Sequence, residues 1–411
     1  MRVLLCLVFL LAGSLAAQES SLSLSEAVQT GVARHPEVRA RQLRVEAARA
    51  FAEGTGTQPN PVLTLAGVLG DAQEETNNFT QRLEISGQPR LRSEIARLEL
   101  EREELGLTAL QRRLALRVAR AYYAFWAASR RLEVAQTRQQ LAARLEFVAL
   151  RRYEVGEVSR NEHLRAQLEK ARADAELAAV QSEERGSRLQ LALLLGLARD
   201  VPLVLPAGLE APEALPSGEL LEVTELLERA RSRPEVAAAE RNLELGQKEA
   251  ELATKEMAPS LEFMAYRSKL YSSNIEQGVM LSLSLPLFDY GEVGAEVDRR
   301  RGEAQARTVD RESLLLELDL EVQEAWQRQL EFLGRRDSLR DQTLRYRELS
   351  ELSQRGYDAG FLTLLETLDT QRAYREALLE RIQSEAEAQV SRLELHLVSG
   401  GVFPLVKEEK P

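Results

Sequence analysis

The stretch Arg151-Arg-Tyr153-Glu-Val-Gly156 lies between two long helical patterns, and Gln167 follows eleven residues after the glycine. The same frame returns as Gly356-Tyr357-Asp-Ala-Gly360, with Gln371 again eleven residues further on. Tyrosine, glycine and glutamine therefore all repeat at an offset of 204 residues. A constant offset of this size predicts a structural unit of about half the chain that is present twice.

A second pair of segments marks the start of each copy. His35-Pro36-Glu37-Val38 interrupts one helical pattern and begins another, and Arg233-Pro234-Glu235-Val236 does the same 198 residues later. The residue before a proline avoids the helical region, so each copy is expected to open with a broken helix. The predicted organisation is a first repeat at 18–200, a linker at 201–221, a second repeat at 222–400 and a tail at 401–411.

The first 17 residues have the pattern of a secretory signal peptide. Met1-Arg2 precedes an apolar run from Val3 to Ala12, and small residues lead to an expected cleavage site after Ala17. Cleavage would remove Cys6, the only cysteine, so no disulfide is expected in the exported chain. No later stretch is long and apolar enough to suggest a transmembrane helix.

The charge balance excludes some classes of partner. The 411 residues carry 65 Asp and Glu against 54 Lys and Arg, a formal net charge of −11. An acidic exported chain is a poor candidate for binding nucleic acid or an anionic membrane surface. Its composition, 44% hydrophobic and 29% charged but only 5% aromatic, is typical of long helices.

Two β-hairpins are predicted, at 61–86 and 259–286. Their second strands alternate between apolar and polar residues, as in Val279, Leu281, Leu283 and Leu285 against Met280, Ser282 and Ser284. Alternation with period two predicts a strand with one apolar face. Four strands of about nine residues fit a membrane-spanning length, but four cannot close a barrel, so a homo-oligomer with a shared barrel is expected.

Long helices are predicted at 92–152 and 293–355, with return helices at 158–195 and 362–398. Helices of this length with charged faces are expected to pack side by side as antiparallel coiled coils. The turns from Tyr153 to Gly156 and from Tyr357 to Gly360 would close each helical hairpin, since glycine supplies the backbone freedom that a tight reversal needs.

This order of elements, together with Leu365-Glu366-Thr-Leu368-Asp369-Thr-Gln371-Arg372, resembles the TolC-like outer-membrane efflux proteins. The stretches Pro59-Asn-Pro-Val-Leu-Thr-Leu65 and Gln81-Arg-Leu-Glu-Ile-Ser-Gly87-Gln-Pro-Arg90 resemble the heavy-metal (CzcC-like) branch of that family. That branch usually has a glycine and a lysine where this chain has Gln88 and Pro89.

The resemblance implies a mainly α-helical fold with a small β part. It implies a homotrimer whose twelve strands form one barrel in the lipid of the bacterial outer membrane, continued by an α-helical tunnel through the periplasm. Its implied partners are a periplasmic adaptor (membrane fusion protein) and an inner-membrane pump, most often of the RND type. The implied function is the passive exit duct of a tripartite efflux system, and the branch resemblance implies heavy-metal or other cations as its cargo.

The resemblance also gives candidate site residues. Glu366 and Asp369 fall at the acidic constriction of the periplasmic entrance, with Asn161 and Glu162 at the related place in the first copy; the alternative is a solvated helix face favoured by the helix dipole. Tyr153, Gly156, Tyr357 and Gly360 fall at the periplasmic tips, where the tyrosines could latch neighbouring hairpins or only pack their rings.

Catalytic, metal-binding and cofactor motifs are not found in the sequence. The three histidines are isolated, and no cysteine pair, phosphate-binding loop or nucleophile motif is present, so we expect neither an enzyme nor a cofactor. The alternative to a channel is a soluble periplasmic coiled-coil adaptor or scaffold, which would share the signal peptide and the long helices.

Overall fold

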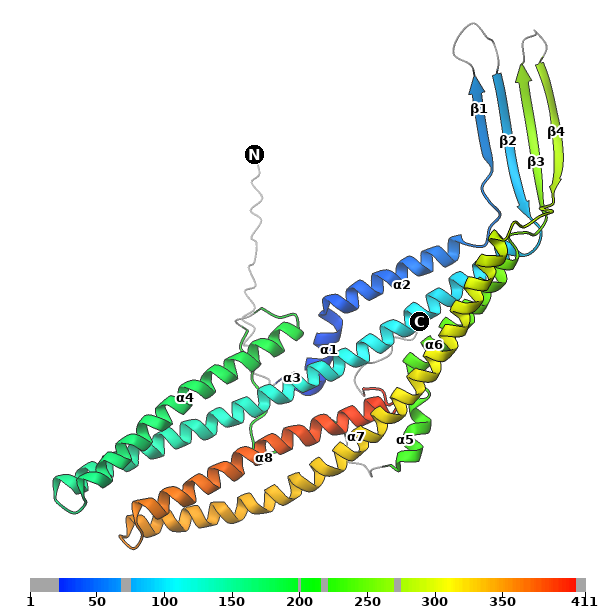
Figure 1. The fold of residues 1–411 in the computed structure, drawn as a ribbon. Coiled ribbons are helices and arrows are strands. Elements are labelled where there is room, and N and C mark those ends of the chain that lie inside the picture. The colour runs from blue at the N-terminus through cyan, green and yellow to red at the C-terminus, as the bar shows by residue number, and fades with distance from the viewer. Residues whose placement is uncertain (1–21, 68–74, 199–200, 216–220, 270–274, 404–411) are drawn as a thin grey trace, which may run out of the picture. The chain divides into compact units, whose positions relative to one another are not determined.

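The computed structural model describes residues 22–67, 75–198, 201–215, 221–269 and 275–403. The predicted signal peptide and most of the C-terminal tail lie outside these residues. The helices are α1 Leu24–Arg34, α2 Pro36–Gly54, α3 Gln88–Glu154, α4 Arg160–Leu194, α5 Val223–Ala230, α6 Pro234–Thr254, α7 Glu292–Asp358 and α8 Leu364–Val398. The strands are β1 Val62–Gly67, β2 Glu75–Glu84, β3 Ser260–Lys269 and β4 Ile275–Ser284. The expected mainly helical fold with a small β part is confirmed (Figure 1).

The two long helices have 67 residues each, and both extend slightly beyond their expected bounds. α3 begins at Gln88 rather than at residue 92, with Pro89 in its first turn. Proline is tolerated in the first turn because the N–H groups there have no partner within the helix. α7 continues to Asp358, so Tyr357 lies at a helix end rather than in an open turn.

The four strands form one antiparallel sheet in the order β1-β2-β3-β4. The central pair joins the two copies, because β2 comes from the first hairpin and β3 from the second. The register places Leu83, Leu261 and Leu283 in one row across the sheet and Arg82, Glu262 and Ser282 in the next. Neighbouring rows point to opposite faces, so one face carries an apolar row and the other a polar one.

The chain folds into two compact units, and each unit contains segments of both sequence repeats. The first comprises the chain up to Thr30, Val118–Glu213 and Leu339–Gln389. The second comprises Gly31–Arg117, Ala214–Ser338 and the chain from Val390 onward. The predicted repeats therefore describe the order of elements along the sequence, whereas each compact core is built from both copies.

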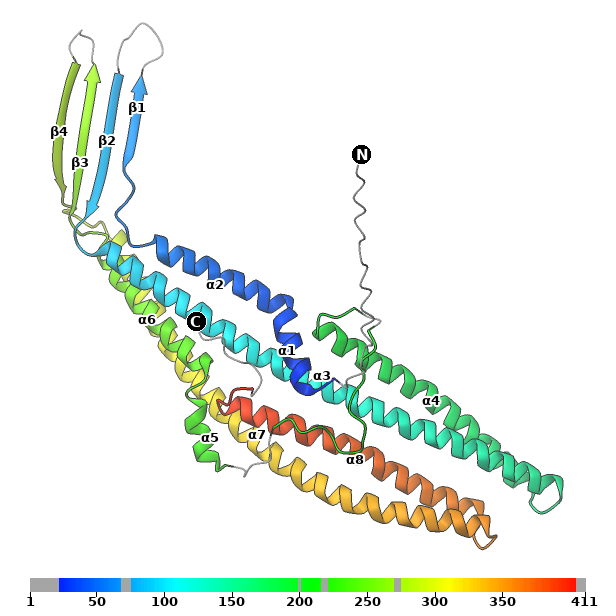
Figure 2. The same ribbon diagram turned by 180° about the vertical axis from the view of Figure 1, so that it is seen from behind.

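The first unit holds two helical hairpins, in which α4 lies along α3 and α8 lies along α7 (Figure 2). Arg138 of α3 forms an ion pair with Glu176 of α4, and the Thr343 hydroxyl of α7 donates to the Ala377 carbonyl of α8 at 3.4 Å. Tyr122 and Trp126 of α3 are buried, and the Tyr122 hydroxyl donates to the Leu22 carbonyl at 2.9 Å. The buried face of α3 thus anchors the segment that precedes α1.

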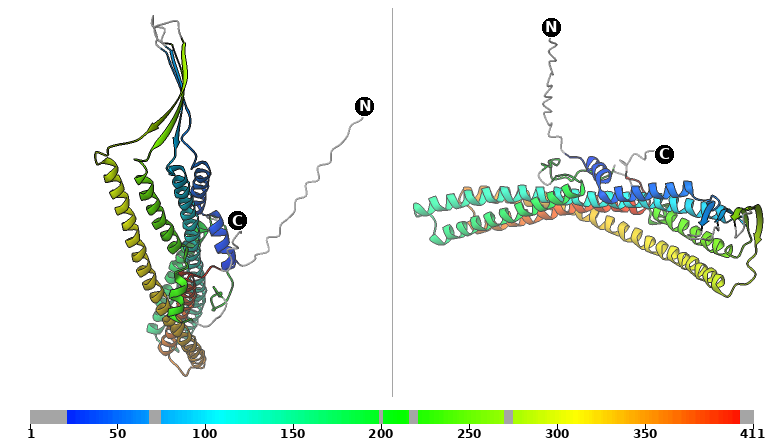
Figure 3. Two further views of the ribbon diagram at one scale, coloured as in Figure 1. Left: turned by 90° about the vertical axis from the view of Figure 1, so that its right-hand side faces the viewer. Right: turned by 90° about the horizontal axis from the view of Figure 1, so that it is seen from above.

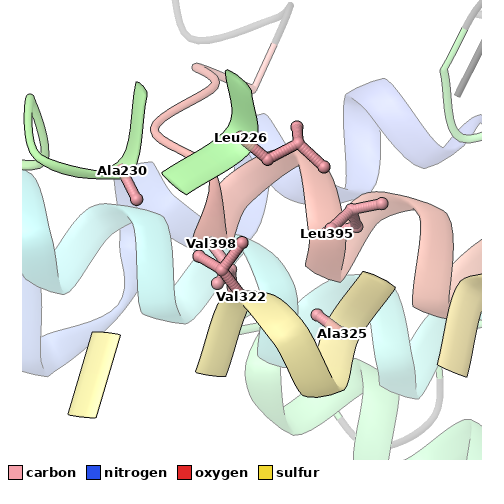
Figure 4. Packing of buried hydrophobic residues seen from close by; sticks show 6 residues of the cluster. All are labelled: Leu226, Ala230, Val322, Ala325, Leu395 and Val398. Carbon is pink, nitrogen blue, oxygen red and sulfur yellow. The ribbon is translucent and has the colours of Figure 1, made fainter. Parts of the chain in front are cut away.

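The second unit holds the sheet and the remaining helical parts. Arg307 of α7 bonds the Glu249 carboxylate of α6 at 2.9 Å, and the two helices lie side by side in both views of Figure 3. A core cluster brings together α5, α7 and α8 (Figure 4). Its buried members are Leu226, Ala230, Val322, Ala325, Leu395 and Val398.

Among the described residues, no helix has an apolar stretch long enough to cross a lipid bilayer.

The apolar face of the sheet is open to the surroundings in the single chain, where Leu281 is 67% exposed. Where this face meets lipid, as the resemblance implies, Leu281→Arg should destabilise the folded membrane form by about 2–4 kcal/mol, because a charged side chain in the hydrocarbon region is costly. Refolding into lipid vesicles, followed by denaturant titration, measures this effect. Ser282→Arg on the opposite face is the matched control, and equal losses in both variants would contradict the assignment of the faces.

Candidate functional site

The two helical hairpins reverse through turns with the same hydrogen bonds. In the first, the Gly156 N–H donates to the Tyr153 carbonyl at 3.0 Å and the Glu157 N–H donates to the Arg152 carbonyl at 2.8 Å. In the second, the corresponding donors are the Gly360 and Phe361 N–H groups, at 3.0 and 2.8 Å. This pair of bonds defines a Schellman motif, which requires a left-handed residue after the helix end. Gly156 and Gly360 both supply it, each with φ of +79°.

The return helices begin with equivalent caps at the same offset of 204 residues. The Ser159 hydroxyl accepts from the Glu162 N–H at 3.3 Å, and the Thr363 hydroxyl accepts from the Glu366 N–H at 3.3 Å. The Glu366 carboxylate returns two bonds, accepting from the Thr363 N–H and hydroxyl at 2.8 Å each. Thr363 and Glu366 thus form a capping box, and Glu366 helps to start α8 in addition to carrying charge.

The two candidate carboxylates of α8 lie close together in space. Glu366 and Asp369 are both exposed and three residues apart, which places them on one side of the helix. The bonds from Thr363 hold the pKa of Glu366 below its usual value. Asp369 is 3.9 Å from the guanidinium of Arg372, at the limit of an ion pair. Both groups therefore project negative charge close to the hairpin tip.

The equivalent positions in the first hairpin carry a different set of charges. Glu162 is half-buried and corresponds to Glu366, whereas Asn161 is exposed and corresponds to Leu365. Asp369 corresponds to Arg165, a cation. Of the four candidate constriction residues, only Glu162 and Glu366 occupy equivalent positions in the two copies.

The two tip tyrosines differ in their surroundings. Tyr357 is 2% exposed and packs in a cluster with α3 and α4, and the Arg152 guanidinium lies 5.2 Å from its ring centroid. The buried residues around it are Leu145, Ala149, Ala166 and Leu364. Tyr153 is 40% exposed and stacks on His163 of its own hairpin, with ring centroids 5.7 Å apart. Tyr357 therefore joins the two hairpins of one chain, whereas the outer surface of Tyr153 is open.

Sequence reasoning missed two apolar side chains at the tips. Val155 is 71% exposed and Phe361 is 87% exposed, and each is next to the glycine of its turn. The signal that could have identified them is their position, because a large apolar residue in a solvent-facing turn has no core to enter. Ser159 and Thr363 were also missed, although each precedes a glutamate by three residues in the capping-box pattern.

The described residues contain no group of three or more His, Cys, Asp or Glu arranged to hold a metal ion.

The sequence matches the family described as "Outer membrane efflux protein" over residues 27–197 and 226–401. The chain belongs to the outer membrane efflux protein family. Comparison with curated protein sequences finds no match.

Three solved structures of outer-membrane channels are similar to this family member. The channel OprN is 23% identical in sequence with a TM-score of 0.76, and the match covers 92% of this chain and 90% of the OprN chain. CusC is 19% identical with a TM-score of 0.77, covering 92% of both chains. The open state of the MtrE channel from Neisseria gonorrhoeae is 22% identical with a TM-score of 0.75, covering 93% of this chain and 90% of its own. The likeness extends over nearly the whole described fold.

Membership of the outer membrane efflux protein family defines the general role of the chain. It is a homotrimeric pore protein of the outer membrane with its helical part in the periplasm, and it is not an enzyme. It serves as the exit duct of a tripartite efflux system, together with a periplasmic adaptor and an inner-membrane pump of the RND type. The alternative of a soluble adaptor or scaffold is set aside by the family match.

A Cβ at Gly156 or Gly360 would meet no atom within 4 Å, so a larger residue there causes no steric clash with its neighbours. Any loss of stability on substitution should therefore come from the left-handed backbone conformation. Gly360→Ala should weaken the turn by about 1–2 kcal/mol, the cost of the left-handed conformation for a residue with a Cβ. Hydrogen exchange at the Gly360 and Phe361 amides should then be about tenfold faster.

Gly186→Ala is the matched control, since Gly186 lies inside α4 with equally open space around it. That change should stabilise the helix by about 1 kcal/mol, because alanine has the higher helix propensity. Equal exchange at the turn amides in wild type and Gly360→Ala would show that the left-handed backbone does not limit the stability of the tip.

Proposed function

We propose that the periplasmic entrance of this exit duct selects cations through Glu366 and Asp369, and that the cargo of the efflux system is cationic. The observation that carries the proposal is the pair of exposed carboxylates on one side of α8, within the first two turns after the hairpin tip. Three-fold symmetry repeats this pair as six carboxylates. A ring of carboxylates around a narrow pore favours cations over anions.

Asp369 and Glu366 contribute to this field in different ways. The capping box fixes the Glu366 carboxylate at the start of α8, so its charge has a defined position. Asp369 is less constrained, since its ion pair with Arg372 spans 3.9 Å. Glu162 would add negative charge from the first hairpin, and Arg165 would offset part of it. The second hairpin therefore supplies most of the proposed selectivity.

The narrower form of the proposal is that heavy-metal cations are the cargo. Its support is the resemblance of residues 59–65 and 81–90 to the heavy-metal branch; these stretches include the start of β1 and the end of β2. A host lacking its own outer-membrane efflux channels, supplied with this chain and a heavy-metal pump with its adaptor, tests this form directly. Restored metal resistance supports this form. A parallel host receives this chain with a drug pump and its adaptor, and restored drug resistance there, without restored metal resistance in the first host, contradicts it.

The selectivity test replaces Glu366 by Gln and Asp369 by Asn together. Gln can still form the capping box, so the double variant removes charge while preserving the start of α8. In planar lipid bilayers we expect a higher single-channel conductance, because cations are no longer held by the carboxylates at the entrance. We also expect a reversal potential closer to zero under a salt gradient, because the pore loses its preference for cations.

Glu376→Gln is the control, because Glu376 is an exposed carboxylate further along the same helix. The role of these two residues would be refuted if the double variant had the conductance and reversal potential of the wild type. It would also be refuted if Glu376→Gln changed both quantities as much as the double variant does.

We further propose that Val155 and Phe361 contact the periplasmic adaptor. Both are large apolar side chains exposed at the ends of the hairpins, where an adaptor that docks on the tips would cover them. Phe361→Asp should weaken adaptor binding to the purified trimer at least tenfold, since burying a carboxylate in an apolar contact is unfavourable. Biolayer interferometry with the adaptor measures the dissociation constant.

Leu193→Asp is the matched control, because Leu193 is also exposed but lies near the opposite end of α4 from the tip. Unchanged adaptor affinity in Phe361→Asp would place the adaptor contact elsewhere on the chain.

A further inference from the structure

A cavity of about 370 Å³ lies within the first unit, between the two helical hairpins. Its lining comes from α3, α4, α7 and α8. Apolar side chains form much of its wall: Leu141, Ala142, Leu145, Leu368 and Leu378. The space is large enough for a small aromatic molecule and has the apolar lining typical of an organic-ligand site.

Among the described lining residues, arginine is the more frequent charged residue: Arg138, Arg372 and Arg375 stand against Glu133 and Glu169. Glu169 of α4 accepts from Arg372 of α8 at 2.5 Å and from Arg172 at 2.8 Å. Arg138 of α3 lies 3.6 Å from the same carboxylate. Burial would raise the pKa of Glu169, but the neighbouring arginines outweigh it and lower the pKa. Glu169 thus contacts three guanidinium groups, of which those of Arg138 and Arg372 belong to the lining.

Glu133, the other acidic residue in the described lining, is already engaged. Glu133 pairs with Arg130 at 2.8 Å. Glu176 pairs with Arg138, and Asp369 lies near Arg372. Both acidic residues of the described lining, Glu133 and Glu169, therefore already have cationic partners.

Arg375 is a further cation of the lining. It lines the cavity from α8 and is half-buried, and its guanidinium forms no ion pair or hydrogen bond within the part of the chain that the structure describes. Burial and the positive charges of Arg375 and Arg372 lower the pKa of Arg138. A half-buried guanidinium is stabilised by an anionic partner, and the cavity beside it has room for one.

We propose that this cavity binds a small amphipathic organic anion. Its acidic group, a carboxylate or sulfonate, pairs with Arg375, and its apolar body packs against the leucines of the wall. A cation is disfavoured by the surplus of arginine. Inorganic phosphate would satisfy the charge but leave the apolar wall in contact with water, so the organic anion is the better fit. Glu366 and Asp369 do not line the cavity, although Asp369 lies 3.9 Å from the lining residue Arg372. The proposal does not depend on the nature of the cargo.

The probe for the binding test is 4-(trifluoromethyl)benzenesulfonate, followed by fluorine NMR with the purified trimer in neutral detergent. Empty micelles provide the background. We expect saturable line broadening with the protein and at least tenfold weaker binding of the neutral analogue 4-(trifluoromethyl)benzyl alcohol. Arg375→Gln should raise the dissociation constant about tenfold or more, which is the usual contribution of a charge-assisted hydrogen bond.

Arg340→Gln is the control, since Arg340 is an exposed arginine of the same unit that pairs with Glu210 at 2.7 Å and does not line the cavity. Ala142→Phe places a ring in the cavity and should abolish binding while retaining every charge. If that variant fails to form trimers, Arg375→Gln alone decides the outcome. Absence of binding above the micelle background, or equal affinity in wild type and Arg375→Gln, would overturn the proposal.

Discussion

The reversal of two 67-residue helices at left-handed glycines is the constraint on which the first unit depends. A helix of this length with charged faces has no core of its own and is stable only against a neighbour. The Schellman bonds at Gly156 and Gly360 stop each long helix, and the caps at Ser159 and Thr363 start the return helix within a few residues. Each long helix thereby gains an antiparallel partner from its own chain.

The two turns share their backbone geometry but differ in the side chains around them. The hydrogen bonds of the two turns agree to within 0.1 Å. Tyr357 nevertheless packs between the hairpins, whereas Tyr153 stacks on His163 and remains open on its outer side. Because the backbone of the turn needs only glycine and a capping residue, the remaining tip positions can carry different side chains in the two hairpins. Tyr357 thus makes contacts within the chain, whereas Tyr153 keeps an exposed surface.

The sequence was informative where a backbone requirement restricts the choice of residue. Glycine at the turns, proline at the helix breaks and alternation in the strands predicted the order of elements. The sequence was less informative where the role of a side chain depends on residues that are distant along the chain. No local pattern distinguishes the buried Tyr357 from the exposed Tyr153, and the surroundings of Arg375 depend on residues more than 200 positions away, such as Arg138 and Glu169. The capping role of Glu366 was readable from Thr363, three residues earlier.

The pairing of β2 with β3 has a consequence for how the protein is made. The described strands form one open sheet with β1 and β4 at its edges, so each of these two strands has a free edge in a single chain. Such edges are open to pairing with any available strand, including those of the wrong partner. Only the arrival of two further chains removes them, so the rate of barrel closure should rise steeply with the local concentration of chains. Between synthesis and closure, each chain would depend on protection of its two strand edges.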